Sequence, residues 1–157
     1  MVENLAAVQP DDDQRCRSDD ALVDALIGAS SAKRSDRITI AGASRIDLLM
    51  DLLHRGFTRA SCRAASGPHA GEPASDVLWL PVVGPEEPFL FTLRKLGREL
   101  RPGGRLAIHV EDAARAPSVI AALAANGFGV ESRTVAPNGE LFIGARRETH
   151  ACALRAA

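Results

Sequence analysis

The sequence contains no tyrosine, one tryptophan and five phenylalanines, so aromatic residues make up only 4% of its 157 residues. This scarcity excludes a core built mainly from aromatic rings. Apolar residues still make up 46% of the chain. The sequence therefore predicts a core of leucine, valine, isoleucine and alanine, the usual filling between a sheet and its covering helices. A chain of this length is expected to form one domain.

Cysteine is also scarce, with Cys16, Cys62 and Cys152 as the three examples and no C-x-x-C pair. An odd number of cysteines without this spacing indicates neither a disulfide framework nor a zinc site. The four histidines are scattered and show no i, i+4 pairing. We therefore expect reduced thiols, no bound metal and a cytoplasmic location.

Excess charge and long apolar runs are missing as well. The formal net charge is -1, whereas proteins that bind nucleic acid usually carry a clustered basic excess. No run approaches the roughly 20 apolar residues that a membrane helix needs, and the first residues lack the basic and apolar regions of a signal peptide. We expect no nucleic-acid partner and no membrane partner.

The segment 93–110 gives the clearest structural signal in the chain. Three leucines recur at helical spacing and end at Leu100, Pro102 and Gly103 suit the central positions of a tight turn, and residues 105–110 alternate as a strand does. This segment predicts a helix that leads through a turn into a buried strand.

The rest of the chain alternates between predicted strands and helices. The first part is expected to contain a flexible tail over 1–18 and then a helix and connector over 19–36, with the helix capped by Ser18 or Asp19. The middle is expected to contain a strand at 37–41, a helix at 44–56, an edge strand at 57–64, a loop at 65–75 and a strand at 76–83. The last part is expected to contain a helix ending near Leu100, a strand at 105–110, a helix at 113–126, a hairpin over 128–146 and a tail at 148–157. The loop at 65–75 is too short for the strand and helix that a doubly wound domain would normally place there.

This order predicts an α/β fold with three layers, a Rossmann-like domain over residues 37–147. Alternating strands and helices favour a mostly parallel sheet covered on both faces. Asn138 and Gly139 between two alternating segments indicate an antiparallel hairpin at the C-terminal end. The expected sheet is shortened by one strand and one helix between residues 65 and 75.

The helix at 44–56 carries three detailed expectations. Ser44 and Asp47 have the spacing of a capping box, and Gly56 suits a C-terminal cap. Its buried face is predicted to consist of four apolar residues at helical spacing: Ile46, Leu49, Met50 and Leu53.

The second half of the chain resembles the class I S-adenosylmethionine-dependent methyltransferases. In that family a helix ends in a Leu-x-Pro-Gly-Gly turn before a strand, and Leu100–Gly104 has this pattern. The family's later helix-Gly-Phe feature is matched by Asn126–Phe128, and its closing hairpin by Glu131–Arg146. The similarity covers about residues 37–147 and implies the methyltransferase-like fold.

The cofactor-binding motif that the resemblance implies is degenerate in this chain. The family places an acidic residue and a glycine-rich turn at the first strand, and a second acid at the end of the second strand. Here Gly42 keeps the first glycine, but Ile40 stands at the first acidic position and Ser44 and Ile46 stand at later glycine positions. Cys62–Ala64 offers no second acid.

Four residues remain as candidate ligand contacts. Gly42, Ala43 and Ser44 precede a helix whose first N–H groups could hold an anion, although a simple helix cap explains the same residues. Arg63 follows a strand and could bind the phosphate of a phosphorylated ribose, although a solvated arginine at a sheet edge is the commoner case.

The other polar residues near the strand ends carry weaker signals. Acids at the start of a helix ordinarily complement its dipole, so four acids are interpreted as structural rather than catalytic: Glu86, Glu87, Glu111 and Asp112. His109 alternates with apolar neighbours and Trp79 lies in an apolar strand, so both are predicted to be packed. We assign no catalytic residue.

Three functions therefore remain open. The favoured one is a non-catalytic methyltransferase-like domain that acts as a binding, scaffolding or regulatory module and needs no cofactor. The second is a small active methyltransferase that uses S-adenosylmethionine with an atypical loop. The third is a nucleotide-binding protein that uses Arg63. The missing strand also leaves a sheet edge that natural proteins cover by association, which predicts a homodimer or a protein partner.

Overall fold

The computed structural model describes residues 11–41, 45–64, 74–82 and 86–147. The helices are α1 (Asp11–Ser30), α2 (Ile46–His54), α3 (Glu86–Leu96) and α4 (Ala116–Ala125), with two short 3-10 helices, η1 (Gly97–Glu99) and η2 (Ala113–Arg115). The strands are β1 (Ile38–Ala41), β2 (Ser61–Arg63), β3 (Ser75–Val82), β4 (Leu100–Val110), β5 (Phe128–Ala136) and β6 (Gly139–Arg146). The tail at 148–157 and most of the loop at 65–75 lie outside these residues.

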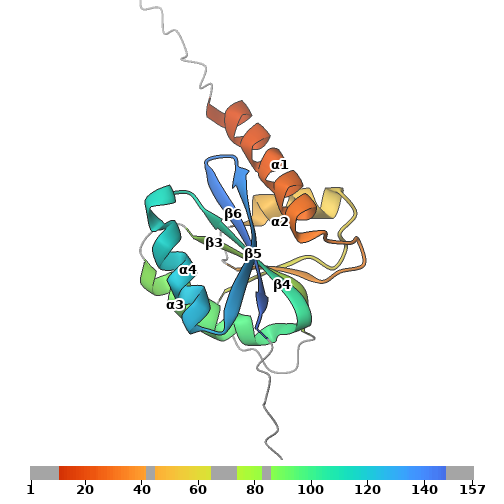
Figure 1. The fold of residues 1–157 in the computed structure, drawn as a ribbon. Helices are drawn as coiled ribbons and strands as arrows, with labels where there is room; N and C mark the ends of the chain where they lie inside the picture. The colour runs from red at the N-terminus through yellow and green to blue at the C-terminus, as the bar shows by residue number, and fades with distance from the viewer. Residues whose placement is uncertain (1–10, 42–44, 65–73, 83–85, 148–157) are drawn as a thin grey trace, which may run out of the picture.

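The six strands form one sheet in the order β2-β1-β3-β4-β6-β5. The strands β2, β1, β3 and β4 run parallel to one another, while β6 runs antiparallel to both β4 and β5. Helices α1 and α2 cover one face of the sheet, and α3 and α4 cover the other (Figure 1). The predicted three-layer Rossmann-like fold and its antiparallel hairpin are therefore confirmed.

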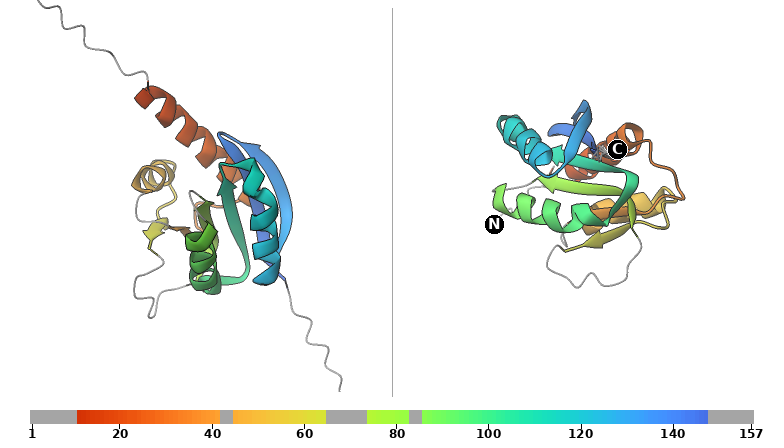
Figure 2. Two further views of the ribbon diagram at one scale, coloured as in Figure 1. Left: turned by 90° about the vertical axis from the view of Figure 1, so that its left-hand side faces the viewer. Right: turned by 60° about the horizontal axis from the view of Figure 1, so that its bottom comes forward.

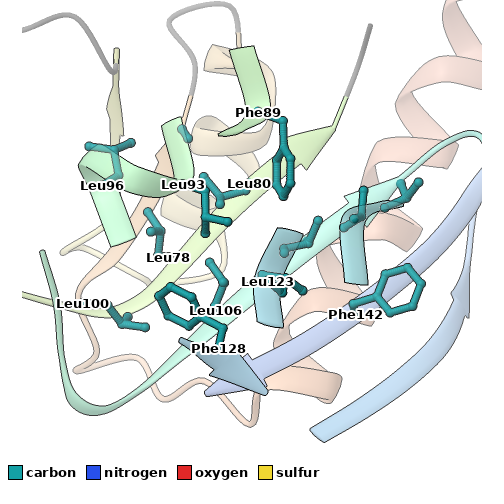
Figure 3. Packing of buried hydrophobic residues seen from close by; sticks show 14 of the residues in the cluster. Leu78, Leu80, Phe89, Leu93, Leu96, Leu100, Leu106, Leu123, Phe128 and Phe142 are labelled. Atoms are coloured by element: carbon teal, nitrogen blue, oxygen red, sulfur yellow. The ribbon is translucent and has the colours of Figure 1, made fainter. Parts of the chain in front are cut away.

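The face under α3 and α4 is built largely by the segment that gave the clearest sequence signal. Leu93 and Leu96 of α3 pack with Leu106 of β4 and Leu123 of α4, and all four are at most 1% exposed (Figure 3). Full burial of one such side chain contributes about 1.5–3 kcal/mol. The helix-to-strand prediction for 93–110 is confirmed, with η1 inserted between helix and strand.

The prediction of a turn at Pro102 and Gly103 before the strand is wrong, because β4 already begins at Leu100 and both residues lie inside it, at an irregularity of its pairing with β3. Ser75 is opposite Leu100, whereas Val77, two residues later, is opposite Arg105. The extra β4 residues loop out, and Gly103 takes a positive φ of 76°, a conformation that glycine adopts without steric cost.

Helix α1 begins earlier than predicted. It starts at Asp11 rather than after a cap at Ser18 or Asp19, so the predicted tail over 1–18 is wrong for residues 11–18. Its second half packs on the sheet, because Leu22, Val23 and Leu26 are at most 5% exposed. Figure 2 shows the first turns of α1 extending beyond the rest of the molecule, where no apolar periodicity is needed.

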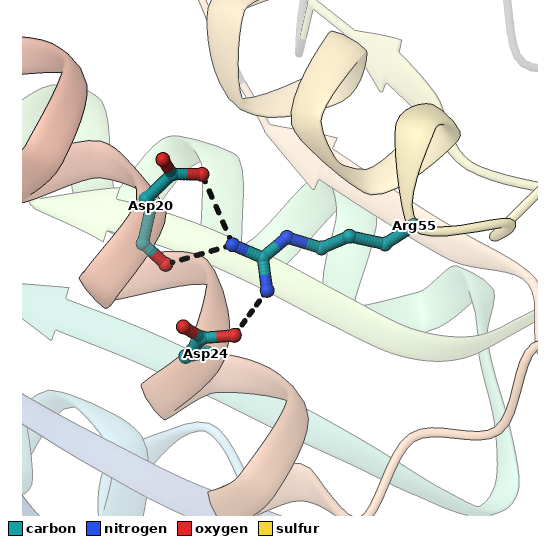
Figure 4. A network of polar contacts seen from close by, with 3 residues as sticks. All are labelled: Asp20, Asp24 and Arg55. Atoms are coloured by element: carbon teal, nitrogen blue, oxygen red, sulfur yellow. Dashed lines mark hydrogen bonds and ion pairs between the residues drawn. The ribbon is translucent and has the colours of Figure 1, made fainter.

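An arginine at the end of α2 ties that helix to α1. The Arg55 guanidinium donates to the carboxylates of Asp20 and Asp24, with 3.0 Å between Arg55 Nη2 and Asp20 Oδ1 (Figure 4). The two aspartates are exposed, so each pair contributes little to stability. The contact mainly orients α1 on the sheet face that it shares with α2.

Helix α2 departs from the sequence prediction at its start and on its buried face. Its N-cap residue is Arg45, which makes no side-chain capping bond, so the predicted capping box is wrong; Ser44 itself lies outside the described residues. The buried residues are Leu48 and Leu52. Ile46 is 59% exposed and Met50 is 44% exposed, so the predicted face is also wrong at these two positions.

The end of α2 was predicted correctly. Gly56 has a φ of 89°, and its N–H bonds to the Leu53 carbonyl at 2.9 Å while the Phe57 N–H bonds to the Leu52 carbonyl at 3.0 Å. This pair of bonds is a Schellman motif, in which glycine supplies the left-handed residue. The strand that follows is β2 alone, much shorter than the expected 57–64, and among the described strands it lies at an edge of the sheet.

Candidate functional site

The sheet order locates the crevice in which α/β proteins of this kind bind ligands. From β1 the chain moves to β2 on one side and then to β3 on the other, so the switch point lies between the carboxyl ends of β1 and β3. The connections that follow these strands are residues 42–44 and 83–85. The predicted contacts Gly42, Ala43 and Ser44 therefore lie outside the described residues.

The position where a first acid was expected belongs to the hydrophobic core. Ile40 of β1 is 0% exposed and lies in the same cluster as Leu48 and Leu52 of α2. A carboxylate at this place would be buried among apolar side chains, which is strongly unfavourable without a partner. This end of β1 is therefore built for packing.

The thiol of Cys62 in β2 makes a hydrogen bond to the backbone. Cys62 Sγ donates to the backbone carbonyl of Arg45 at 3.4 Å, which links β2 to the start of α2. Burial raises the pKa of the Cys62 thiol, so the protonated form is favoured. A protonated thiol is a poor nucleophile, and we assign Cys62 no catalytic role.

Arg63, the predicted phosphate contact, already has a carboxylate partner. Its guanidinium forms an ion pair with Glu99 of η1, and the two side chains are 13% and 22% exposed. An anion that approached Arg63 would have to compete with this carboxylate. Cys62 precedes Arg63 in β2 and Ala64 follows the strand, and neither side chain is acidic.

Two buried polar side chains lie on the sheet face that α1 and α2 cover. His109 of β4 is 2% exposed and Trp79 of β3 is 0% exposed, so the prediction that both are packed is confirmed. His109 Nε2 lies 3.2 Å from the Pro137 carbonyl oxygen. His109 Nδ1 and Trp79 Nε1 are buried and have no hydrogen-bond partner within the described part of the chain.

The surroundings of His109 favour a neutral ring. Burial lowers the pKa of His109, the bond to Pro137 and the charge of Glu111 oppose this shift, and the charge of Arg45 adds to it. Arg45 is a site residue that the sequence analysis did not single out. In the sequence, only its position directly after the small residues 42–44 pointed to a place near the site.

The buried imidazole predicts a pH dependence of stability. Because its pKa is lower in the folded than in the unfolded chain, the unfolded chain binds more protons as the pH falls below the ordinary histidine value of about 6.5. We expect the free energy of unfolding to fall with pH in that range, by at most about 1.4 kcal/mol per pH unit for one proton. Urea unfolding between neutral and mildly acidic pH measures this slope.

A leucine at position 109 provides the matched comparison. His109→Leu keeps a side chain of similar size and removes the titrating group, so it should flatten the histidine part of the slope. His54 is exposed, so His54→Leu serves as the control and should leave the slope unchanged. An identical slope in His109→Leu and the parent chain would show that this imidazole does not carry the effect.

The acids near the strand ends have structural contacts or lie in solvent. Asp112 caps η2 by accepting a bond from the Ala114 N–H at 3.0 Å, and Glu111 is exposed. The side chains of Glu86 and Glu87 at the start of α3 are not among those described. Within the described ranges, no three potential metal ligands cluster together, and no helix has the length and apolarity to cross a membrane.

Comparison with solved structures finds methyltransferases. The ribosomal protein L11 methylase of Lactobacillus delbrueckii subsp. bulgaricus aligns with a TM-score of 0.60 and 14% identity over 80% of this chain and 77% of that chain. The sugar N-methyltransferase KedS8 of Streptoalloteichus aligns with a TM-score of 0.62 and 17% identity over 94% of this chain and 99% of that chain.

A third structure shows the same likeness over a larger protein. CalO1, a methyltransferase of calicheamicin biosynthesis solved in its SAH-bound form, aligns with a TM-score of 0.62 and 14% identity over 85% of this chain. The chain spans only 54% of the length of CalO1. No protein-family model matches the sequence, and no curated protein matches it either. The strand order and these structural neighbours together give the chain a class I S-adenosylmethionine-dependent methyltransferase-like fold.

Proposed function

We propose that this protein is a non-catalytic member of the methyltransferase-like folds and acts as a binding, scaffolding or regulatory module. Folds of this kind bind ligands at the switch point of the sheet, and they carry many unrelated functions.

The observation that carries the proposal is that neither β1 nor β2 ends in an acidic residue. Ile40 is fully buried in the core, and the end of β2 presents a protonated thiol and an arginine that is paired with Glu99. The described residues therefore do not fit the two-acid pattern of the adenosyl site.

Isothermal titration calorimetry with S-adenosylmethionine and S-adenosylhomocysteine tests the proposal directly. We expect no saturable binding of either ligand with a Kd below about 100 μM, which corresponds to a binding free energy of about -5.5 kcal/mol. CalO1 serves as the positive control, because its structure holds SAH. Micromolar binding of either ligand by this chain would overturn the non-catalytic assignment.

The active-methyltransferase alternative is supported by one feature of the site. His109 presents a neutral, buried imidazole near Arg45 and Glu111 at the carboxyl end of β4. A neutral imidazole can accept a proton from a substrate, but His109 is 2% exposed and would first have to become accessible. This alternative needs cofactor binding, so the same calorimetric titration decides between the two functions.

The nucleotide alternative depends on Arg63. A phosphate would have to displace the Glu99 carboxylate, so Glu99→Gln should tighten binding of NADP if this alternative holds, and Arg63→Ala should abolish it. Equal thermal shifts with NADP in these two variants would exclude Arg63 as the phosphate contact.

We also propose that the protein associates with itself or with a protein partner. Phe91 is 51% exposed and Val135 is 84% exposed, and β2 and β5 form the two edges of the described sheet. Exposed strand edges and apolar side chains favour a homodimer or a protein partner. Light scattering distinguishes a homodimer from a monomer, and a monomeric mass at all concentrations would exclude the homodimer.

A further inference from the structure

A hollow of about 390 Å³ lies near the amino ends of the parallel strands, at the opposite end of these strands from the switch point. Arg105 near the start of β4 pairs with Ala145 of β6, so the end of β6 lies beside the amino ends of the parallel strands. The hollow is lined by the end of α3 with η1, the junction of α4 with β5, and the end of β6. Four of its nine lining residues are arginines and none is acidic: Arg94, Arg98, Arg146 and Arg147.

The arginine at the end of β6 is held in place by its neighbours. The Arg146 guanidinium lies over the Phe128 ring, 5.6 Å from its centroid, and donates to the backbone carbonyl of Gly97. Gly97 has no side chain, and a Cβ there would lie 3.2 Å from the Phe128 ring. Because these contacts fix Arg146 in advance, it would lose little conformational freedom on binding a ligand.

All four arginines are exposed. Within the described ranges, the structure records no carboxylate partner for Arg94, Arg98 or Arg147. Cations near a helix C-terminus stabilise the helix dipole, which accounts for the two arginines at the end of α3 and in η1. It does not account for the arginines that close β6.

We propose that this hollow binds the phosphate or diphosphate group of an organic phosphate. The planar fork of arginine donates two parallel hydrogen bonds to phosphate oxygens. Several guanidinium groups around one hollow repel one another unless an anion lies between them. A single carboxylate would leave most of this charge uncompensated, so a multiply charged phosphate group is the better match.

A neighbouring groove indicates where the organic part of the ligand lies. A groove of about 310 Å³ between α3 and α4 shares Arg94 and Asn126 with the hollow. Apart from these two and Ser118, its lining is apolar: Phe89, Leu90, Val119, Ala121, Ala122 and Ala125. Each space alone has the size of a small ligand pocket, about 300–1,000 Å³. The pair fits a molecule with a charged head and an apolar remainder.

Calorimetric titration of the full chain with three phosphates tests this assignment. Inorganic pyrophosphate probes the hollow alone, decyl diphosphate adds an apolar chain, and ADP adds a nucleoside. We expect pyrophosphate to bind, with affinity falling as salt is added, and at least one of the two organic diphosphates to bind more tightly. Tighter binding by decyl diphosphate would indicate a lipid-like source, and tighter binding by ADP a nucleotide.

Three variants locate the binding site. We expect Arg94→Gln and Arg98→Gln each to weaken binding by about tenfold. Both side chains are exposed, so the variants should fold, and thermal melting checks this. Arg133→Gln removes the same charge from the middle of β5, where Arg133 pairs with Glu140, and should leave binding unchanged.

Several results would overturn the proposal. The first is the absence of saturable binding for all three phosphates. The second is equal affinity of Arg94→Gln, Arg98→Gln and the parent chain for the phosphates. Equal affinity for all three phosphates would exclude the groove as part of the site. Tighter binding of a single-stranded oligonucleotide than of every small phosphate would identify a nucleic-acid surface instead. None of these results depends on S-adenosylmethionine binding at the carboxyl ends of β1 and β3.

Discussion

Replacing Gly139 with alanine is expected to lower the free energy of unfolding by more than about 3 kcal/mol. Gly139 opens β6 with a φ of 153°, and a Cβ at this position would lie 2.1 Å from the Val110 carbonyl oxygen and 2.8 Å from the Glu111 Cα. Both contacts are with backbone, which cannot turn away as a flexible side chain can. Relief of the clash would require β6 to separate from the end of β4.

Two other glycines serve as control positions, because alanine there changes the backbone freedom without causing such a clash. Gly103 has a φ of 76°, but a Cβ added there would meet no atom within 4 Å, so Gly103→Ala should cost only the backbone term of about 1–2 kcal/mol. Gly28 lies in α1 with open space around it, so Gly28→Ala should stabilise by about 0.5–1 kcal/mol. Urea unfolding of the three variants gives the comparison. A Gly139→Ala cost no larger than that of Gly103→Ala would contradict the close packing of β6 on β4.

The role of Gly139 illustrates the limit of a local signal. Asn138 and Gly139 correctly predicted a hairpin, but its two loop residues are Pro137 and Asn138, with Asn138 at a φ of 57°. Gly139 instead pairs with Ala136 and approaches β4. The turn could be predicted from neighbouring residues, whereas the approach to β4 depends on a strand about 30 positions away in sequence.

The predictable part of the fold follows from periodicity and turn chemistry. The leucine spacing before Leu100 predicted a buried helix face, and the alternation after Gly104 predicted a strand; both were confirmed, although residues 106–110 are buried on both faces of the sheet. Gly104 adds a requirement that periodicity does not reveal. A Cβ there would lie 2.8 Å from Leu100 Cδ1 and 3.0 Å from the Asp76 carbonyl oxygen, so the second glycine of the turn is needed because the strands approach closely.

The candidate sites divide in the same way. The lack of acids at Ile40 and at the end of β2 could be read directly from the sequence once the strands were placed. The arginine hollow could not, because Arg94 and Arg98 come from α3 and η1, whereas Arg146 ends β6 and Arg147 follows it. The i, i+4 spacing of the first pair and the adjacency of the second pair are visible in the sequence. Only the order of the strands in the sheet brings the two pairs together.

Helix α2 shows why an apolar pattern can fail within one element. Its sequence, Ile46–His54, is apolar at six of nine positions, so two overlapping faces both satisfy helical spacing. The choice between them is made by the sheet, against which Leu48 and Leu52 are buried while Ile46 and Met50 face outward. A test of this choice therefore tests how α2 is docked.

Substituting Leu52 with alanine is expected to cost about 3–5 kcal/mol of the free energy of unfolding. The side chain is 0% exposed in the cluster that also holds Ile40 and Phe57, so its removal leaves a cavity as well as losing transfer free energy. Met50→Ala on the same helix is the matched control. Because Met50 is 44% exposed, the control should cost less than about 1 kcal/mol.

Chemical denaturation of the two variants decides which face of α2 meets the sheet. A larger cost for Met50→Ala than for Leu52→Ala would restore the face that the sequence alone predicted and would contradict the packing of α2. The result also bears on the adenosyl site, since Leu52 and Ile40 share one cluster. A large cost at Leu52 would mean that Ile40 belongs to a tightly packed core, so a carboxylate could not be introduced at the end of β1 without disrupting the fold.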